Sequence, residues 1–120
     1  LLPGDDVDRA VEDVRQTIGD LSPYRVSVEK GTYMLPALVD PEHQGVQALV
    51  EAHRQVRGIE PETFYGTGTF DAGGPCSAGV PAVMYGAGGG GSFIGVDFAP
   101  ISQVIDEARV VTRTILSLVG

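Results

Sequence analysis

Residues 79–86 read Gly-Val-Pro-Ala-Val-Met-Tyr-Gly, an unbroken apolar run between two glycines. A short run of this kind is typical of a β-strand covered on both faces, as in parallel sheets. Residues 24–29, Tyr-Arg-Val-Ser-Val-Glu, alternate apolar and polar side chains, which indicates a strand with one packed and one solvent-exposed face. Residues 64–65 are predicted to form a third, short strand. Because helical segments separate these strands, the sequence predicts an α/β protein.

Three segments have the periodicity of amphipathic helices. Residues 5–18 place valine or isoleucine every three or four positions, and their first turn is acidic, which suits the positive end of a helix. Residues 42–57 follow a capping Asp40 and end before Gly58. A last helix begins near Ser102. Its buried side is expected to carry Val104, Ile105, Ala108, Val111, Ile115 and Leu118.

The chain changes character near residue 36. Residues 1–36 contain the alternating strand, which suggests an antiparallel sheet, whereas residues 37–120 contain the apolar strand between helices. We therefore predict a boundary at residues 35–40, with residues 1–36 and 37–120 belonging to different domains.

Composition excludes several classes of partner. The 120 residues include 16 acidic and 8 basic side chains, so the net charge of -8 repels phosphate backbones and anionic lipid surfaces. We expect neither nucleic acid nor a membrane to be a partner. Cys76 is the only cysteine, so no intrachain disulfide can form, and a cytoplasmic location is expected.

Two local motifs have structural explanations. Residues 86–91, Gly-Ala-Gly-Gly-Gly-Gly, satisfy the dinucleotide-binding fingerprint, but Gly95 and Pro100 follow where that fingerprint needs a helix. A loop that turns tightly or approaches another group closely explains them better. Cys76 would need a base to become a nucleophile, and His43 and His53, both on the second predicted helix, are better explained as structural residues.

Five motifs occur in the order found in one enzyme family. They are Leu-Leu-Pro-Gly-Asp at 1–5, Ala-Leu-Val-Asp-Pro-Glu-His at 37–43, Tyr-Gly-Thr-Gly-Thr-Phe-Asp-Ala at 65–72, Gly-Val-Pro-Ala-Val-Met-Tyr-Gly-Ala-Gly at 79–88, and the closing helix with Glu-Ala-Arg at 107–109. Together they resemble the C-terminal portion of the zinc-dependent amidohydrolases that include acetylornithine deacetylase, succinyl-diaminopimelate desuccinylase, aminoacylase and carboxypeptidase G. The resemblance implies that residues 1–36 are the second half of an α+β dimerisation lid. Residues 37–120 would be the C-terminal part of an α/β catalytic domain.

The resemblance also implies where substrate and metal would bind. The family holds two zinc ions, mostly through an N-terminal half that also supplies the general base, so we expect no metal and no catalytic residue in this segment alone. One family ligand is a histidine after the Gly-rich loop, where this chain has Phe93, and Asp97 is the nearest alternative oxygen donor. The role left for this segment is to position a substrate carboxylate with its backbone amides. The residues expected to do this are Gly66, Gly68, Thr69, Gly86 and Gly88.

Two functions follow as hypotheses. The first is the C-terminal portion of a metal-dependent amidohydrolase or peptidase that cleaves an amide bond of an N-acyl amino acid or small peptide and is inactive without its N-terminal half. The second is a non-catalytic module derived from such an enzyme, used for oligomerisation or carboxylate binding. Because half a lid would leave a sheet edge and an apolar helix face uncovered, we expect either a homodimer or association with the missing half.

Overall fold

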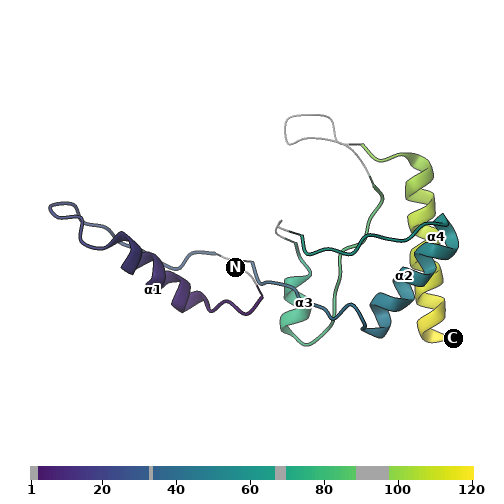
Figure 1. Ribbon diagram of the computed structural model, residues 1–120, viewed down its shortest axis with the longest axis horizontal. Helices are drawn as coiled ribbons and strands as arrows, with labels where there is room; N and C mark the ends of the chain where they lie inside the picture. Colours follow the sequence, from purple (N-terminus) through teal and green to yellow (C-terminus); the bar gives the residue numbers. More distant parts are fainter. Residues whose placement is uncertain (1–2, 33, 67–69, 89–97) are drawn as a thin grey trace. The chain divides into compact units, whose positions relative to one another are not determined.

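The computed structural model describes residues 3–32, 34–66, 70–88 and 98–120. Four helices follow one another along these residues: α1 (Val7–Ile18), α2 (Gln44–Arg57), α3 (Gly73–Ser77) and α4 (Ile101–Val119) (Figure 1). Contacts divide the described residues into two units. The first consists of described residues within 1–38 and 68–82, and the second of those within 39–67 and 83–120.

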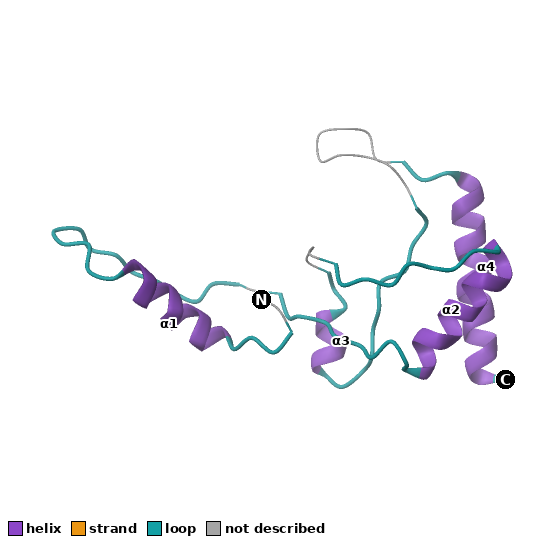
Figure 2. Ribbon diagram, viewed as in Figure 1, coloured by secondary structure: helices purple, strands orange, loops and turns teal. Residues whose placement is uncertain are grey.

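The predicted α/β fold is wrong. Helix makes up 48% of the described residues and no sheet is present among them, so the described part of the chain is all-helical. The segments predicted as strands, residues 24–29, 64–65 and 80–85, are irregular connections (Figure 2). A strand is stable only when neighbouring strands satisfy its backbone groups, and within the described residues these segments find no such neighbour.

Side-chain caps explain where α1 and α2 begin. The Asp6 carboxylate accepts a hydrogen bond from the Arg9 N–H at 2.8 Å, so α1 begins after Asp6. The Nδ1 atom of His43 accepts from the Gly45 N–H at 3.1 Å and begins α2 in the same way. Gly58 then ends α2 with φ 67°, a left-handed conformation that glycine adopts without strain. The helices predicted at residues 5–18 and 42–57 are therefore confirmed, with slightly later starts.

In the first unit, α1 is tied to the extended segment that follows it. The guanidinium of Arg15 donates to the Val28 carbonyl oxygen at 2.8 Å, and Lys30 pairs with Asp8 at 3.3 Å. None of the residues of α1 is buried. α1 is therefore connected to this segment mainly by polar contacts at the surface, each of which contributes little to stability.

The second unit is organised around the contact between α2 and α4, which lie side by side (Figure 1). Its buried residues are Val46, Ala52 and His53 of α2 and Val110 of α4, which is 0% exposed.

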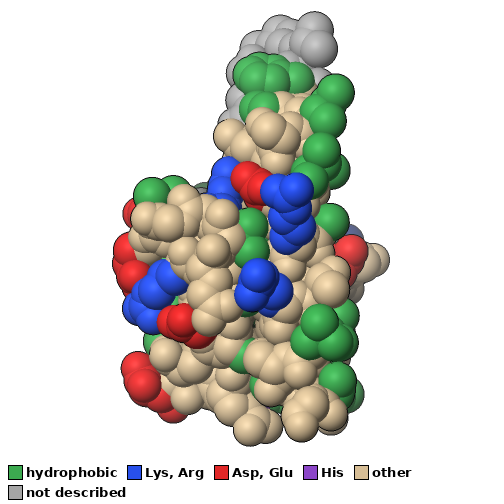
Figure 3. All heavy atoms as spheres, turned by 90° about the vertical axis from the view of Figure 1, so that its right-hand side faces the viewer, with side chains coloured by type: hydrophobic (Ala, Val, Ile, Leu, Met, Phe, Trp, Pro, Cys, Tyr) green, Lys and Arg blue, Asp and Glu red, His purple; other side chains and the backbone are tan. Residues whose placement is uncertain are grey.

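The predicted buried side of the last helix is wrong. Val104, Ile105 and Ile115 are each about half exposed. The packed side of α4 instead carries Val110 together with the half-buried polar residues Gln103 and Glu107. The most apolar face of α4 is thus uncovered, and Figure 3, which views the side of α2 and α4, shows hydrophobic side chains on the surface among charged groups.

Within the described part of the chain, no helix combines the length and apolar character that crossing a membrane requires. The division into domains at residues 1–36 and 37–120 stays a prediction.

Candidate functional site

The segment 85–88, Tyr-Gly-Ala-Gly, is hydrogen-bonded to residues of both α2 and α4. The Tyr85 hydroxyl lies 3.0 Å from the Nδ1 atom of His53 on α2. Two residues later, the Ala87 N–H donates to the Glu107 carboxylate of α4 at 3.0 Å. Both bonds join residues at least 20 positions apart, so they fix the path of this glycine-containing segment over the two helices.

His53 is a buried imidazole with one partner. It is 6% exposed, its ring meets the Tyr85 ring edge-on at a centroid distance of 5.9 Å, and its Nε2 atom has no hydrogen-bond partner. Burial lowers the pKa of His53 below its ordinary value, and the positive charge of Arg57 lowers it further. The imidazole is therefore held in its neutral form, with one nitrogen bound to Tyr85 and the other unpaired.

The pKa of Tyr85 is raised, whereas that of His53 is lowered. Burial raises the pKa of its phenol, because the charged phenolate loses hydration there. Two neutral groups thus form the hydrogen bond, and neither is prepared to exchange a proton at neutral pH. This pair is suited to positioning the segment and not to general acid or base chemistry.

Gly88 lies against a second unpaired polar group. A Cβ atom at Gly88 would lie 2.9 Å from the Oε1 atom of Gln103, and that oxygen is buried without a hydrogen-bond partner. The absence of a side chain at Gly88 allows the backbone to approach the Gln103 amide. The result is a buried acceptor oxygen without a hydrogen-bond partner beside an exposed glycine.

The structure covers only part of the predicted substrate-binding set. Gly86 and Gly88 belong to the segment just described, and a Cβ atom at Gly86 would lie 3.9 Å from a Glu107 carboxylate oxygen. Gly66 lies in the exposed, irregular connection after α2. Gly68 and Thr69, and the metal candidate Asp97 with Phe93 beside it, lie outside the described residues. Their predicted roles are therefore untested.

The described residues do not form a zinc site. Nowhere in residues 3–32, 34–66, 70–88 and 98–120 do three His, Cys, Asp or Glu side chains gather where they could share a metal ion. Cys76 lies half-buried in α3, and its Sγ atom is 3.5 Å from the Ala82 carbonyl oxygen. Because zinc requires converging ligands, the described side chains do not fit the two-metal centre implied by the resemblance.

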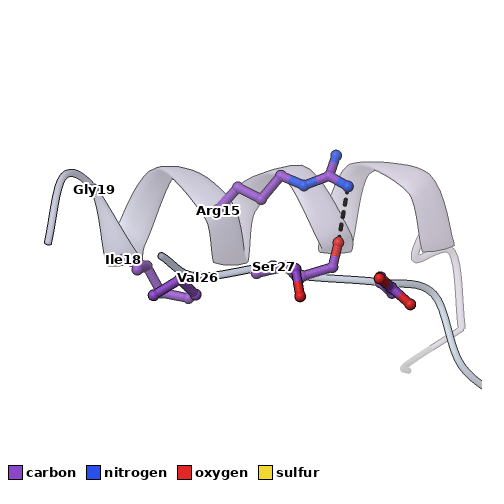
Figure 4. A pocket seen from close by; sticks show the side chains of 7 residues that line it. Arg15, Ile18, Gly19, Val26 and Ser27 are labelled. Carbon is purple, nitrogen blue, oxygen red and sulfur yellow. Dashed lines mark hydrogen bonds between the residues drawn. The ribbon is translucent and has the colours of Figure 1, made fainter. Parts of the chain in front are cut away.

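The first unit has a separate cavity of about 420 Å³, lined by Arg15, Ile18, Gly19 and residues 26–29. Figure 4 shows the Ile18 and Val26 side chains close together below α1, with Arg15 bonded to the Val28 carbonyl. The Arg15 guanidinium is thus already used in holding the extended segment. The cavity offers a ligand no other cation among its lining residues, and we assign it no function.

Comparisons with known proteins add nothing to these observations. The chain matches no family model, no curated protein and no solved structure.

Gln103, Glu107 and Tyr85 were not predicted as members of the site. Gln103 and Glu107 are four residues apart, which places them on one face of a helix, and that spacing was a usable signal. The spacing does not predict, however, that residues 85–88 lie against that face. His53 was predicted to be a structural residue of the second helix, but its pairing with Tyr85, 32 positions away, has no local signature.

Proposed function

We propose that this chain is the C-terminal portion of a metal-dependent amidohydrolase or peptidase, acting on an N-acyl amino acid or small peptide. The observation that carries the proposal is the order of five family-like motifs along nearly the whole sequence. The helical structure contains no sheet of that family among its described residues, so the proposal rests on the motifs and on the local geometry at Gly88. Two zinc ions and the general base would belong to an N-terminal half.

The segment 85–88 supports a role in positioning substrate. An N-acyl amino acid presents an amide N–H, an amide carbonyl and a carboxylate. The unpaired Gln103 oxygen beside Gly88 matches the amide N–H, because a buried acceptor gains most from a donor that replaces its lost water. Such a ligand would bind through Gln103 and the backbone of residues 86–88. From the resemblance, Gly66, Gly68, Thr69, Gly86 and Gly88 stay the proposed substrate-binding residues.

A hydrolysis assay on the pure 120-residue chain tests the catalytic part. With zinc added and a panel of N-acetyl amino acids as substrates, we expect no turnover above the buffer blank, because the resemblance places most zinc ligands and the general base in an N-terminal half. Metal-dependent hydrolysis by this chain alone would contradict the proposal.

Binding tests the positioning part separately. We expect N-acetyl amino acids to shift the backbone amide NMR signals of residues 86–88, and a Gln103→Leu variant to lose these shifts. Gln47→Leu is the matched control, since Gln47 lies on α2 and its amide donates to the Pro41 carbonyl. Shifts that persist in Gln103→Leu would contradict the assigned contact.

A second candidate is a non-catalytic module for oligomerisation or carboxylate binding. The specific observation in its favour is Phe93 at the position where the resemblance places a zinc-binding histidine, since phenylalanine cannot coordinate zinc. The mass and zinc content of the protein isolated from its source separate the two functions. A mass well above 12.6 kDa with bound zinc supports the enzyme, and a zinc-free protein of 12.6 kDa supports the module. For either function, a cytoplasmic location is part of the proposal.

A further inference from the structure

His53 is a buried titratable group whose hydrogen-bond partner lies on an irregular segment. Its side chain is 6% exposed, and its Nδ1 atom lies 3.0 Å from the Tyr85 hydroxyl. Tyr85 is half-buried, and Val83 and Met84 just before it are 46% and 62% exposed. Because no helix holds this segment, Tyr85 is the neighbour of His53 that moves most easily.

The imidazole of His53 has no acceptor for a second proton. A neutral imidazole has one N–H group, whereas a protonated one has two and needs a partner for each. Nδ1 faces the Tyr85 hydroxyl, but Nε2 is buried without a hydrogen-bond partner among the described residues. Protonation therefore puts a positive charge and an unpaired N–H group where water does not reach, which is unfavourable for the folded arrangement.

The charged groups on the α2 side do not offset this effect. Burial is the larger cause of the lowered pKa of His53, and the positive charge of Arg57, one turn further along α2, lowers it further. Glu60, which follows α2, has the opposite effect, but its carboxylate also accepts a hydrogen bond from the Arg54 guanidinium at 2.7 Å. The net result on this side still opposes a charged imidazole.

The opposite side of His53 supplies no compensating negative charge either. Burial raises the pKa of Tyr85, and the negative charges of Glu107 and Asp106 on α4 raise it further, although Arg57 lowers it. The phenol thus stays neutral beside the imidazole. Glu107 is itself engaged with the Ala87 N–H at 3.0 Å.

We propose that protonation of His53 releases the segment 85–88 from α2, so that this segment opens in mildly acidic solution while the helices stay folded. When Tyr85 moves away, water reaches the charged imidazole, and only one hydrogen bond to α2 is lost. The contact between α2 and α4 does not depend on that bond, because Val110 remains fully buried between them. The device is a local one.

The direction of the pH dependence follows from linkage. The closed segment lowers the pKa of His53 from its ordinary value of 6.5, so the closed form binds this proton less readily than the open form. The closed form is therefore favoured above pH 6.5 and is lost as the pH falls through the lower value.

The consequence for binding rests on the proposed function. Gly86 and Gly88 are proposed substrate contacts, and release of the segment 85–88 moves both away from α4. The affinity for N-acetyl amino acids is then expected to fall with the closed population as the pH is lowered. Acid would regulate the same site that positions the substrate.

Amide hydrogen exchange of Ala87 tests the release without any ligand. Its N–H is bonded to Glu107 only while the segment is closed. Between about pH 7.5 and about pH 5.5, where histidine titrates and carboxylates stay ionised, we expect its protection, relative to the exchange of a free chain, to be lost. The amides of Ala52 and Val110 should stay protected, and circular dichroism should show unchanged helices.

Four variants identify the group responsible. His53→Gln should keep Ala87 equally protected across this pH range, whereas His43→Gln, the matched control, should keep the transition of the parent. Arg57→Gln removes a positive charge near His53 and should move the midpoint to higher pH, while Glu60→Gln should move it to lower pH. This pair gives a test even if the His53 variant holds the segment poorly.

Three results would overturn the device. They are protection of Ala87 that is independent of pH in the parent, loss of protection at Val110 together with Ala87, and midpoints that move in the same direction in the Arg57 and Glu60 variants. An NMR titration with N-acetyl amino acids at both ends of the range then tests the proposed function separately. A segment that opens with acid in a protein that binds none of these ligands contradicts only the substrate contact.

Discussion

The Nδ1 atom of His53 lies 3.0 Å from the hydroxyl of Tyr85, so this pair joins α2 to the segment 85–88. Because the imidazole is buried, this hydrogen bond stabilises the neutral ring in a place that water does not reach. The bond therefore couples the position of the glycine-containing segment to the packing of α2.

Tyr85→Phe should destabilise the protein by about 1–3 kcal/mol, since it leaves a buried His53 nitrogen without its partner. Urea unfolding followed by circular dichroism measures the change. Tyr65→Phe is the matched control, because Tyr65 is 68% exposed, and it should have little effect. Equal effects of the two substitutions would show that the hydroxyl of Tyr85 contributes nothing specific.

Stability should fall as the solution is acidified below pH 6.5. The folded protein lowers the pKa of His53 from its ordinary value of 6.5, chiefly by burial, so the unfolded chain binds a proton more readily. The stabilising contribution is fully present above pH 6.5 and is lost as the pH falls through the lower folded pKa. Glu60 has its pKa lowered from 4.5 by Arg54, so its contribution is lost only below pH 4.5.

Unfolding free energies measured between pH 4.5 and 7.5 check this dependence. His53→Gln should flatten the profile in that range, whereas His43→Gln should retain it because His53 is still present. The prediction fails if the His53→Gln protein shows the same slope as the parent.

Helix positions could be predicted because their signals are local. Asp6 begins α1 and Gly58 ends α2, each through contacts within a few residues of chain, so the sequence contains the necessary information. The sheet prediction failed for the opposite reason. The apolar run at residues 80–85 has the composition of a covered strand, but composition cannot supply the neighbouring strands, and Val80, Val83 and Met84 are exposed.

The face of α4 shows the same limit. Periodicity identified its apolar side correctly, but an apolar side is buried only when something covers it. Val104 and Ile115 are exposed, while Gln103 and Glu107 face the segment 85–88. Of the candidate site, Gly86 and Gly88 were predictable from their lack of side chains. Their neighbours Gln103 and Glu107 were not, because these contacts join residues distant in the sequence.

Two adjacent glycines of α3 should respond very differently to the same substitution. A Cβ atom at Gly73 would overlap the Leu35 carbonyl oxygen, whereas at Gly74 it would meet nothing within 4 Å. Since the group that blocks a side chain at Gly73 is backbone, Gly73→Ala should destabilise the first unit by about 1–3 kcal/mol or more. Gly74→Ala should be neutral or slightly stabilising. Amide hydrogen exchange of residues 34–38 and 70–82 measures both, and similar protection in the two variants would contradict the close approach.

Gln103→Leu should stabilise the protein by up to about 1 kcal/mol while it removes the proposed ligand contact. The Oε1 atom of Gln103 is buried without a hydrogen-bond partner, and an unpaired buried polar atom destabilises the folded state. Leucine fills a similar volume without that polar group. Natural sites retain such groups when a ligand uses them, so a gain in stability with a loss of N-acetyl amino acid binding is the expected combination.

Thermal unfolding and the amide NMR titration, carried out on the same Gln103→Leu sample, measure the two effects together. Gln103→Glu is the companion variant, because it keeps the acceptor but places a negative charge at a half-buried position close to Glu107, and it should be less stable than the parent. If Gln103→Leu is instead less stable than the parent, the Gln103 amide has a structural partner, and it cannot be the free acceptor on which the proposed substrate contact depends.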